Sequence, residues 1–219
     1  MDIEILYEDK YLIACIKPSG VISEDGGLPD MLSKQLNAKR IFCVHRLDKD
    51  VGGVMIYAKD GKTAALLSEA ISAHRAKKEY LLICQGAPEE TAGTLFDLLY
   101  HDKQKNKTYV VKKERKGVKD AALDYEVLAK NTENGVSLVK VTLKTGRSHQ
   151  IRVQFASRKI PLAGDGKYGS GIKQPKLALW SYRYSFIHPV TGEEICAEET
   201  PPIENLWAAF EKEIGQITM

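Results

Sequence analysis

The chain has 219 residues, of which 43% are hydrophobic and 28% charged, and its formal net charge is +3. These are the values of an ordinary globular protein that is long enough to bury a substantial core. The sequence has no apolar run of about 18 residues, which argues against a membrane-spanning helix. The acidic start, residues 1–4, lacks the basic region of a secretory signal, so we expect a cytoplasmic protein.

Short apolar runs separated by polar turns predict strands and helices in the first half of the chain. Asp60 is a typical N-cap, and apolar residues at helical spacing follow it. We expect this helix to end in the cations Arg75, Lys77 and Lys78, which suit a helix C-terminus. The other expected elements are strands at residues 3–7, 11–16, 41–44, 54–58 and 80–84 and a short helix at 28–37.

The second half contains a strong hairpin signal, Asn134-Gly135, between two segments of alternating apolar residues. A helix is expected from the turn at residues 145–148 as far as Arg158. Strands and helices do not alternate regularly, so we predict a single α+β domain on a mixed, mostly antiparallel β-sheet with flanking helices. The remaining expected elements are strands at 121–129, 137–143, 178–186 and 194–197 and an amphipathic helix at 205–214.

Charge is distributed unevenly along the chain. Residues 102–119 contain eight Lys or Arg and two acids, whereas residues 193–213 contain seven Glu and one Lys. This asymmetry indicates one face suited to a polyanion such as RNA. A solvated, flexible hairpin is the alternative interpretation of the basic segment.

The four cysteines, Cys15, Cys43, Cys84 and Cys196, form no Cys-x-x-Cys motif of the kind that binds metal or carries redox chemistry. Each lies among apolar residues. We therefore expect four buried, free thiols in a reducing compartment.

A loop dense in charge and glycine, residues 45–53, lies between two expected strands. Its Arg46 and Asp48 are two positions apart, so in extended backbone they point to the same side and the guanidinium could orient the carboxylate. A structural ion pair is the better interpretation of these residues alone. His45 with Asp48 or Asp50 has no second ligand cluster nearby in sequence, so no metal is expected.

A second group of polar residues lies at the expected strand-to-helix transition near residue 148. Arg147, His149 and Arg152 supply donors there, next to the free backbone N–H groups of a helix start, and together they favour an anion site. A plain polar helix start is the alternative. Tyr80, at the start of a strand, could stack on a base, although a lone Tyr usually serves packing.

Taken together, these segments resemble the RluA-type family of pseudouridine synthases. The resemblance is collinear over nearly the whole chain, and the His-Arg-Leu-Asp loop with the Gly-Arg-Ser-His-Gln-Ile-Arg segment is highly specific in combination. The matching segments are residues 5–9, 16–20, 44–48, 58–59, 78–80, 145–153, 161–169 and 186–192.

The resemblance implies isomerisation of uridine in structured rRNA or tRNA to pseudouridine, after extrusion of the base, with neither cofactor nor metal. Asp48 would be the catalytic carboxylate, adding to the anomeric carbon or removing the sugar 2′ proton. Tyr80 would stack on uracil and Arg152 would pair with Asp48. The implied RNA contacts are Arg46, His45, Arg147, His149, Lys112, Lys113 and Lys116.

The resemblance also implies one catalytic domain over residues 1–219 with a central RNA-binding cleft. The small N-terminal RNA-binding domain of many relatives is not expected, and a monomer is. Family members commonly carry Thr-Ser where this chain has Val51-Gly52, and His where it has Gln154 and Trp180. We expect these departures to affect substrate preference rather than chemistry.

Two other functions fit parts of the sequence. A non-catalytic RNA-binding or RNA-chaperone protein on the same scaffold would not need Asp48, Tyr80 and Arg152 together. A glycoside hydrolase needs a second carboxylate about 5–9 Å from the first. Asp50 and Asp165 are the candidates, and nothing in the sequence pairs either of them with Asp48.

Overall fold

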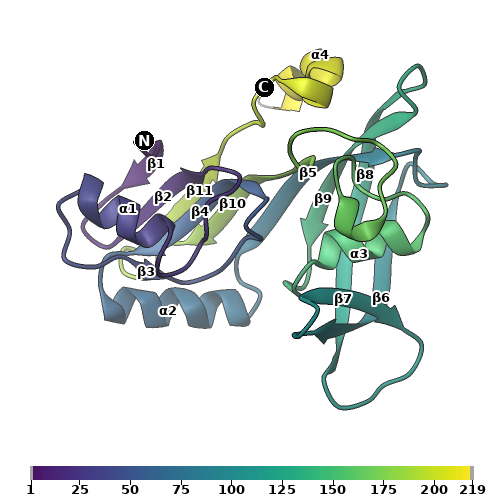
Figure 1. Cartoon of the computed structure of the whole chain (residues 1–219). Coiled ribbons are helices and arrows are strands. Elements are labelled where there is room, and N and C mark those ends of the chain that lie inside the picture. Colours follow the sequence, from purple (N-terminus) through teal and green to yellow (C-terminus); the bar gives the residue numbers. More distant parts are fainter. Residues whose placement is uncertain (1, 218–219) are drawn as a thin grey trace. The chain divides into compact units, whose positions relative to one another are not determined.

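The computed structural model describes residues 2–217, in two compact units (Figure 1). Unit 1 comprises Met1–Glu79 with Trp180–Pro201, and unit 2 comprises Tyr80–Leu179 with Pro202–Met219. The predicted fold class is confirmed, because the strands form a mixed, mostly antiparallel sheet with flanking helices. No helix within residues 2–217 is long and apolar enough to cross a membrane.

In unit 1 the strands follow the order β1-β2-β4-β10, with β3 paired to β4 and β11 to β10. Every residue of β4 is buried, as expected for a strand covered on both faces. The pairing of β4 with β10 is parallel, whereas β1–β2, β2–β4, β3–β4 and β10–β11 pair antiparallel. The elements are β1 (Ile5–Glu8), β2 (Leu12–Lys17), α1 (Leu28–Gln35), β3 (Phe42–Cys43), β4 (Gly52–Ala58), α2 (Gly61–Ser72), β10 (Leu179–Ile187) and β11 (Glu194–Glu198).

Helix α2 begins as predicted, with Asp60 accepting a hydrogen bond from the N–H of Thr63 at 2.9 Å. The helix ends at Ser72, so its predicted extension to Lys78 is wrong. His74 adopts the left-handed conformation, with φ of +55°, and this turns the chain out of the helix. The two lysines that we assigned to the helix end instead belong to strand β5.

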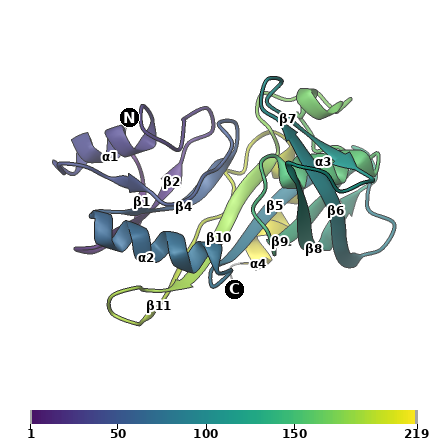
Figure 2. The same ribbon diagram turned by 90° about the horizontal axis from the view of Figure 1, so that it is seen from below.

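Unit 2 is built around the strand order β5-β9-β8-β6-β7. Helix α3 contacts β6 and β7 (Figure 2), and its Val153 packs in one cluster with Leu99 and Ala121. The hairpin at Asn134-Gly135 is confirmed. The elements are β5 (Lys77–Gln85), β6 (Ala92–Asp102), β7 (Lys107–Val111), β8 (Val118–Asn131), β9 (Val136–Leu143), α3 (Gln150–Ser157), a 3-10 turn at Gly166–Tyr168, a 3-10 helix at Asn205–Phe210 and α4 (Glu211–Ile217).

Three further features of this structure differ from the sequence predictions. Strands β6 and β7 were not predicted; they pair residues 98–102 with 107–111, so the start of the basic segment forms a β-hairpin and residues 112–117 follow in the connection to β8. The C-terminal helix is a 3-10 helix as far as Phe210 and an α-helix only after it. All four cysteines are free as predicted, but Cys43 is only partly buried and Cys196 is exposed, because it lies on the outward side of β11.

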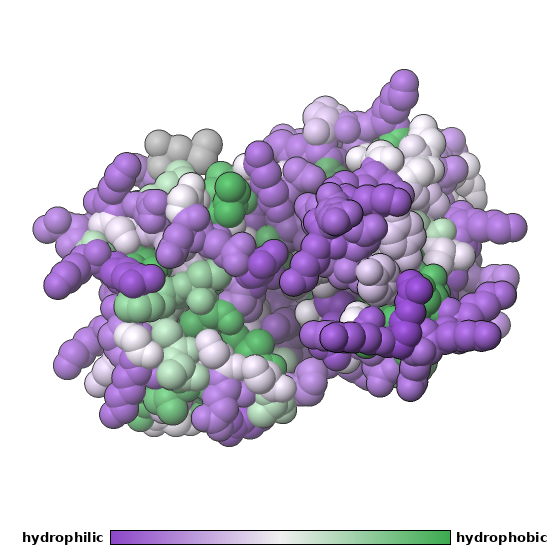
Figure 3. Space-filling model, turned by 60° about the horizontal axis from the view of Figure 1, so that its bottom comes forward, coloured by the Kyte–Doolittle hydropathy of each residue, from purple (hydrophilic) through white to green (hydrophobic). Residues whose placement is uncertain are grey.

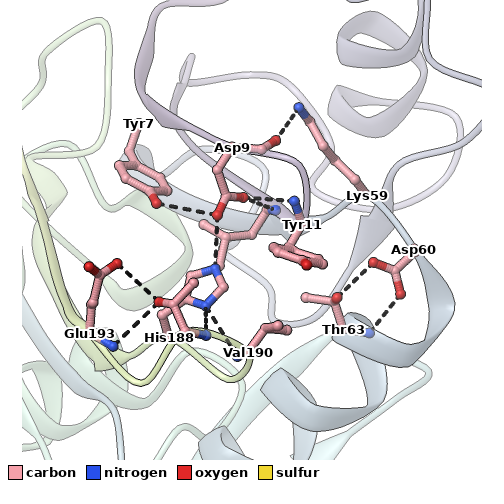
Figure 4. Close-up of polar contacts among 11 residues, drawn as sticks. Tyr7, Asp9, Tyr11, Lys59, Asp60, Thr63, His188, Val190 and Glu193 are labelled. Carbon is pink, nitrogen blue, oxygen red and sulfur yellow. Dashed lines mark hydrogen bonds and ion pairs between the residues drawn. The ribbon is translucent and has the colours of Figure 1, made fainter.

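A polar cluster ties the β10–β11 turn to the β1–β2 turn (Figure 4). The N–H groups of Val190 and Thr191 donate to Nδ1 of the buried His188, so Nε2 carries the proton and donates to Asp9 at 3.0 Å. Asp9 also accepts the N–H groups of Tyr11 and Leu12, at 2.7 and 2.8 Å. Asp9 and His188 therefore have a structural role: they join two turns that are distant in sequence. Both residues lie in segments that match the family pattern, residues 5–9 and 186–192.

The Asp9 cluster predicts a dependence of stability on acid. Burial acts to raise the pKa of Asp9, but the N–H groups of Leu12 and Tyr11, His188 and Tyr7 outweigh it and hold this pKa below its usual value. A carboxylate with a lowered folded-state pKa contributes stability above its unfolded pKa, near 3.8, and that contribution disappears as the pH falls through the folded-state value. Urea unfolding should find Asp9→Asn less stable than wild type by about 1–2 kcal/mol at pH 7.

At a pH below the folded-state pKa of Asp9, the same measurement should find the difference between wild type and Asp9→Asn much smaller. Asp30→Asn is the matched control, because this aspartate is exposed on α1, and its difference from wild type should be small at both values of pH. A wild-type advantage over Asp9→Asn that persists unchanged in acid would contradict the assignment.

Candidate active site

The loop that carries Asp48 is held on both sides by buried neighbours in unit 1. Leu47 is 8% exposed and Val51 is 2% exposed, whereas Asp48 between them is partly exposed. The Ser23 hydroxyl donates to the Leu47 carbonyl at 2.8 Å and accepts the Leu47 N–H at 3.1 Å. The N–H of Val51 then closes a turn onto the Asp48 carbonyl at 3.0 Å. Thus the main chain around Asp48 has a fixed conformation.

Lys17 is a second support for this loop, and sequence reasoning missed it. Its side chain is completely buried, and Nζ donates to the carbonyls of Pro18, Val21 and Lys49 at 3.0, 2.6 and 3.0 Å. Burial lowers the pKa of Lys17 to about 8 against the attraction of Asp50 and Asp48, so the ammonium is still protonated at pH 7. The sequence signal that could have identified Lys17 is its position at the end of a buried strand, directly before Pro-Ser-Gly.

The other two predicted residues of this loop have structural partners. His45 Nε2 accepts the N–H of Ile56 at 3.0 Å, and its ring lies 4.7 Å from that of Tyr184. Burial and the nearby Lys78 hold the pKa of His45 well below its usual value, so this ring is neutral at pH 7. Arg46 is exposed and pairs with Glu24 at 3.1 Å. Their roles as RNA contacts stay predictions.

In unit 2, Arg152 is held by a bidentate ion pair. Its Nε and Nη2 donate to the two carboxylate oxygens of Asp165 at 2.7 and 2.8 Å, and both side chains are at least 95% buried. The guanidinium also lies 5.2 Å from the centre of the Tyr168 ring. Such paired bonds fix the plane of the guanidinium as well as its position. Asp165 is thereby committed to Arg152, which leaves it poorly suited to be the second carboxylate of a glycosidase.

Tyr168 also organises the start of α3. Its hydroxyl accepts the N–H of Thr108 at 2.9 Å and lies 2.8 Å from Nδ1 of the buried His149. His149 begins the helix in the left-handed conformation, with φ of +54°. Arg147 is less buried and donates from Nε to the Asp120 carbonyl at 2.8 Å. Unit 2 therefore brings Arg152 and His149 together through Tyr168, a residue that was not singled out from sequence.

The remaining predicted residues lie apart from this cluster along the chain. Tyr80 belongs to β5 and is 6% exposed. Lys112, Lys113 and Lys116 are all exposed in the connection between β7 and β8. Their exposure suits an electrostatic contact with a polyanion.

The departures from the family pattern have a packing explanation in unit 1. Gly52 lies beside Trp180 in the register of β4 and β10, and a Cβ atom on Gly52 would come within 2.5 Å of the indole ring. Trp180 is anchored by its Nε1, which donates to the Glu199 carbonyl at 2.7 Å. The large residue at 180 thus requires the small one at 52. The buried Gln154 donates to Asp97 at 2.8 Å in unit 2.

This coupling predicts how paired substitutions behave. Gly52→Ala should destabilise the protein by about 1–3 kcal/mol through overpacking against the indole. The same change in a Trp180→His background should cost much less, because the ring that it would strike is gone. Urea unfolding of the four proteins measures the coupling. Gly61→Ala, which adds a Cβ in open space, is the control. Strictly additive effects of the two substitutions would contradict the pairing.

Comparisons with known proteins agree with the fold and the motifs. A family model described as RNA pseudouridylate synthase matches residues 11–157. An uncharacterized RNA pseudouridine synthase of Bacillus subtilis is 31% identical over 93% of this chain and 70% of its own length. Ribosomal large subunit pseudouridine synthase D of Xanthomonas campestris is 30% identical, over 96% of this chain and 70% of its own length.

Among solved structures, human RNA Pseudouridylate Synthase Domain Containing 4 superposes with a TM-score of 0.78 at 23% identity. The match covers 97% of this chain and 93% of the human chain, and it supports the fold. With residues 11–157 matched by the family model and two relatives at 30% identity or more over nearly its whole length, this chain belongs to the RNA pseudouridylate synthase family and is an RNA-modifying isomerase.

Proposed function

We propose that the whole chain acts as one catalytic domain that extrudes a specific uridine from structured RNA and isomerises it with the carboxylate of Asp48. The observation that carries this proposal is the loop itself: Leu47 and Val51 are buried and hydrogen-bonded, and they present a partly exposed Asp48 from a fixed main chain. A reactive group needs such preorganisation, because a loosely held carboxylate loses most of its effect.

The chemistry requires few groups. The C1′–N1 bond of uridine breaks, the uracil turns, and a C1′–C5 bond forms; C5 loses one proton and N1 gains one. Nothing enters or leaves overall, so the reaction consumes no oxidant, reductant or group donor, and we propose that it proceeds without cofactor or metal. Asp48 either adds to C1′ and is later displaced, or takes the proton from C2′ and returns it. Both routes need an ionised Asp48, for which the fixed guanidinium of Arg152 is the proposed partner.

Tyr80 is the proposed platform for the uracil ring, because an aromatic side chain can stack on a flat base and its hydroxyl can exchange a proton. The exposed cations Lys112, Lys113 and Lys116, with Arg46 and Arg147, are the proposed phosphate contacts. The names of two relatives, ribosomal large subunit pseudouridine synthases D and C, favour large-subunit rRNA over tRNA as the substrate.

The test is to incubate the protein with total RNA from cells that lack it and to map pseudouridine in every RNA class. We expect a new site in rRNA. Uridine deuterated at C2′ then separates the two routes, since only proton removal from C2′ is slowed by deuterium. No new site in any RNA would contradict the enzyme assignment and favour a non-catalytic RNA-binding protein.

A further inference from the structure

The register of β6, β7 and β8 sorts their side chains onto two faces. Residues directly opposite each other in antiparallel strands point to the same side, and Tyr100 of β6 is opposite Tyr109 of β7 and Val118 of β8. Leu99, on the other face of β6, is buried against Val153 of α3. The face turned away from α3, which we name the outer face, carries Phe96, Leu98, Tyr100, Tyr109, Val111 and Val118.

The outer face exposes aromatic rings to solvent. Phe96 is 62% exposed, more than any other large hydrophobic side chain in the described range, and Tyr109 is 37% exposed. Isolated exposed apolar residues are common, but several aromatic side chains gathered on one sheet face point to a contact surface. Neither ring contributes to the core beneath α3, so packing does not account for their presence.

Two rings of the outer face, Tyr100 and Tyr109, each have a cation nearby. The Arg115 guanidinium lies 4.7 Å from the centre of the Tyr100 ring, and Lys107 Nζ lies 5.9 Å from that of Tyr109. Figure 3 shows long hydrophilic side chains over the part of the molecule that carries β6, β7 and β8. A groove of about 540 Å³ is lined by Leu98 and Val118 of the outer face together with Arg115, Arg147, Glu114 and Asp120.

The geometry points to a single-stranded segment of the substrate RNA, outside the target uridine, as the occupant of the outer face. Its bases stack on Phe96, Tyr100 and Tyr109, as bases stack on the aromatic side chains of other sheet surfaces. Its phosphates pair with Arg115 and Arg147 at the groove, where Glu114 and Asp120 can accept from base amino groups. This inference rests on the proposed function and adds a contact by which the enzyme selects its RNA.

RNA is favoured over a protein partner by charge. Residues 102–119 contain eight Lys or Arg and only two acids, so the surroundings of the outer face match a polyanion. A cation beside an aromatic ring suits a nucleotide, because the cation can bind the phosphate while the ring stacks on the base. A protein surface would need a comparable density of acids to balance the same cations.

Binding of a fluorescein-labelled oligoadenylate tests this surface, because the probe contains no uridine and cannot occupy the catalytic site productively. Fluorescence anisotropy should find the affinity lowered roughly tenfold by Phe96→Ala or Tyr109→Ala, with an unchanged salt dependence. Tyr109→Phe should bind as wild type does. Charge reversal of Lys112, Lys113 and Lys116 should instead flatten the dependence of affinity on salt.

Ile187→Ala is the matched control, since Ile187 is a 56% exposed aliphatic residue of unit 1 and its loss should leave binding unchanged. Unfolding curves in urea verify that each variant is folded. Wild-type affinity in both Phe96→Ala and Tyr109→Ala would overturn the inference, and so would the absence of oligoadenylate binding by the wild type. Neither result affects the proposed function, which depends on pseudouridine formation and Asp48.

Discussion

Asp48→Asn should abolish pseudouridine formation and leave the fold intact. Asparagine has the shape of aspartate, but its neutral amide neither attacks C1′ nor accepts a proton from C2′. We expect the single-turnover rate to fall at least a thousandfold, which corresponds to about 4 kcal/mol of transition-state free energy. The main-chain contacts of Leu47 and Val51 do not involve the carboxylate, so the loop should keep its conformation.

Asp50→Asn is the matched control for this experiment. Asp50 is an exposed residue of the same loop, and its carbonyl accepts the Ser19 hydroxyl at 2.7 Å, a contact that the substitution preserves. The single-turnover rate of Asp50→Asn should stay within a few-fold of the wild-type rate. The assignment of Asp48 fails if Asp48→Asn retains more than a tenth of wild-type activity on the mapped uridine while binding RNA normally.

The second large effect should follow from Asp165→Ala, which removes the carboxylate that accepts two hydrogen bonds from the buried guanidinium of Arg152. Removing one partner of a buried ion pair typically costs about 3–5 kcal/mol, because the other charge stays buried. The pair is at least 95% buried and bidentate, so the cost should lie in this range. Unfolding in urea, with the slope held common among variants, measures it.

Two further variants separate stability from catalysis. Arg158→Ala breaks a more exposed ion pair with Asp97, 2.9 Å long, and should cost no more than about 1 kcal/mol. The double variant Arg152→Met with Asp165→Ala removes both buried charges and should recover much of the lost stability without recovering activity. If Asp165→Ala costs no more than Arg158→Ala, the pair is not the support that we infer.

Much of the architecture could be predicted because its signals are local. The Asp60 cap, the Asn134-Gly135 turn and the strands around the Asp48 loop depend on residues close together in sequence, and each is confirmed. Strand β6 escaped prediction because its apolar residues, broken only by Asp97, do not alternate regularly with polar ones, and β7 because it lies inside the lysine-rich segment 102–119. Helix α2 was predicted too long because a left-handed residue, His74, carries no strong local signal.

The residues that hold the site in place, such as Lys17 and Asp165, were harder to predict from sequence than the proposed reactive groups. Apart from its position at the end of a buried strand before Pro-Ser-Gly, nothing in the local sequence distinguishes Lys17 from the many exposed lysines, although burial and three carbonyl acceptors set it apart. Asp165 lies 13 residues from Arg152, and pairing across such a distance depends on the fold between them. The departures at Gly52 and Trp180 became interpretable only when the strand register placed them side by side.

The division of unit 1 into two separate stretches of chain has a consequence for biosynthesis. Strand β10 pairs with β4, and His188 closes onto Asp9, which precedes it by 179 residues. During translation the N-terminal strands therefore lack β10 and His188 until almost the entire polypeptide has left the ribosome. Loop closure over such a separation is slow, and strands whose edges are still unpaired can pair incorrectly. We expect nascent chains truncated before residue 180 to resist protease better in residues 80–179 than in residues 1–79.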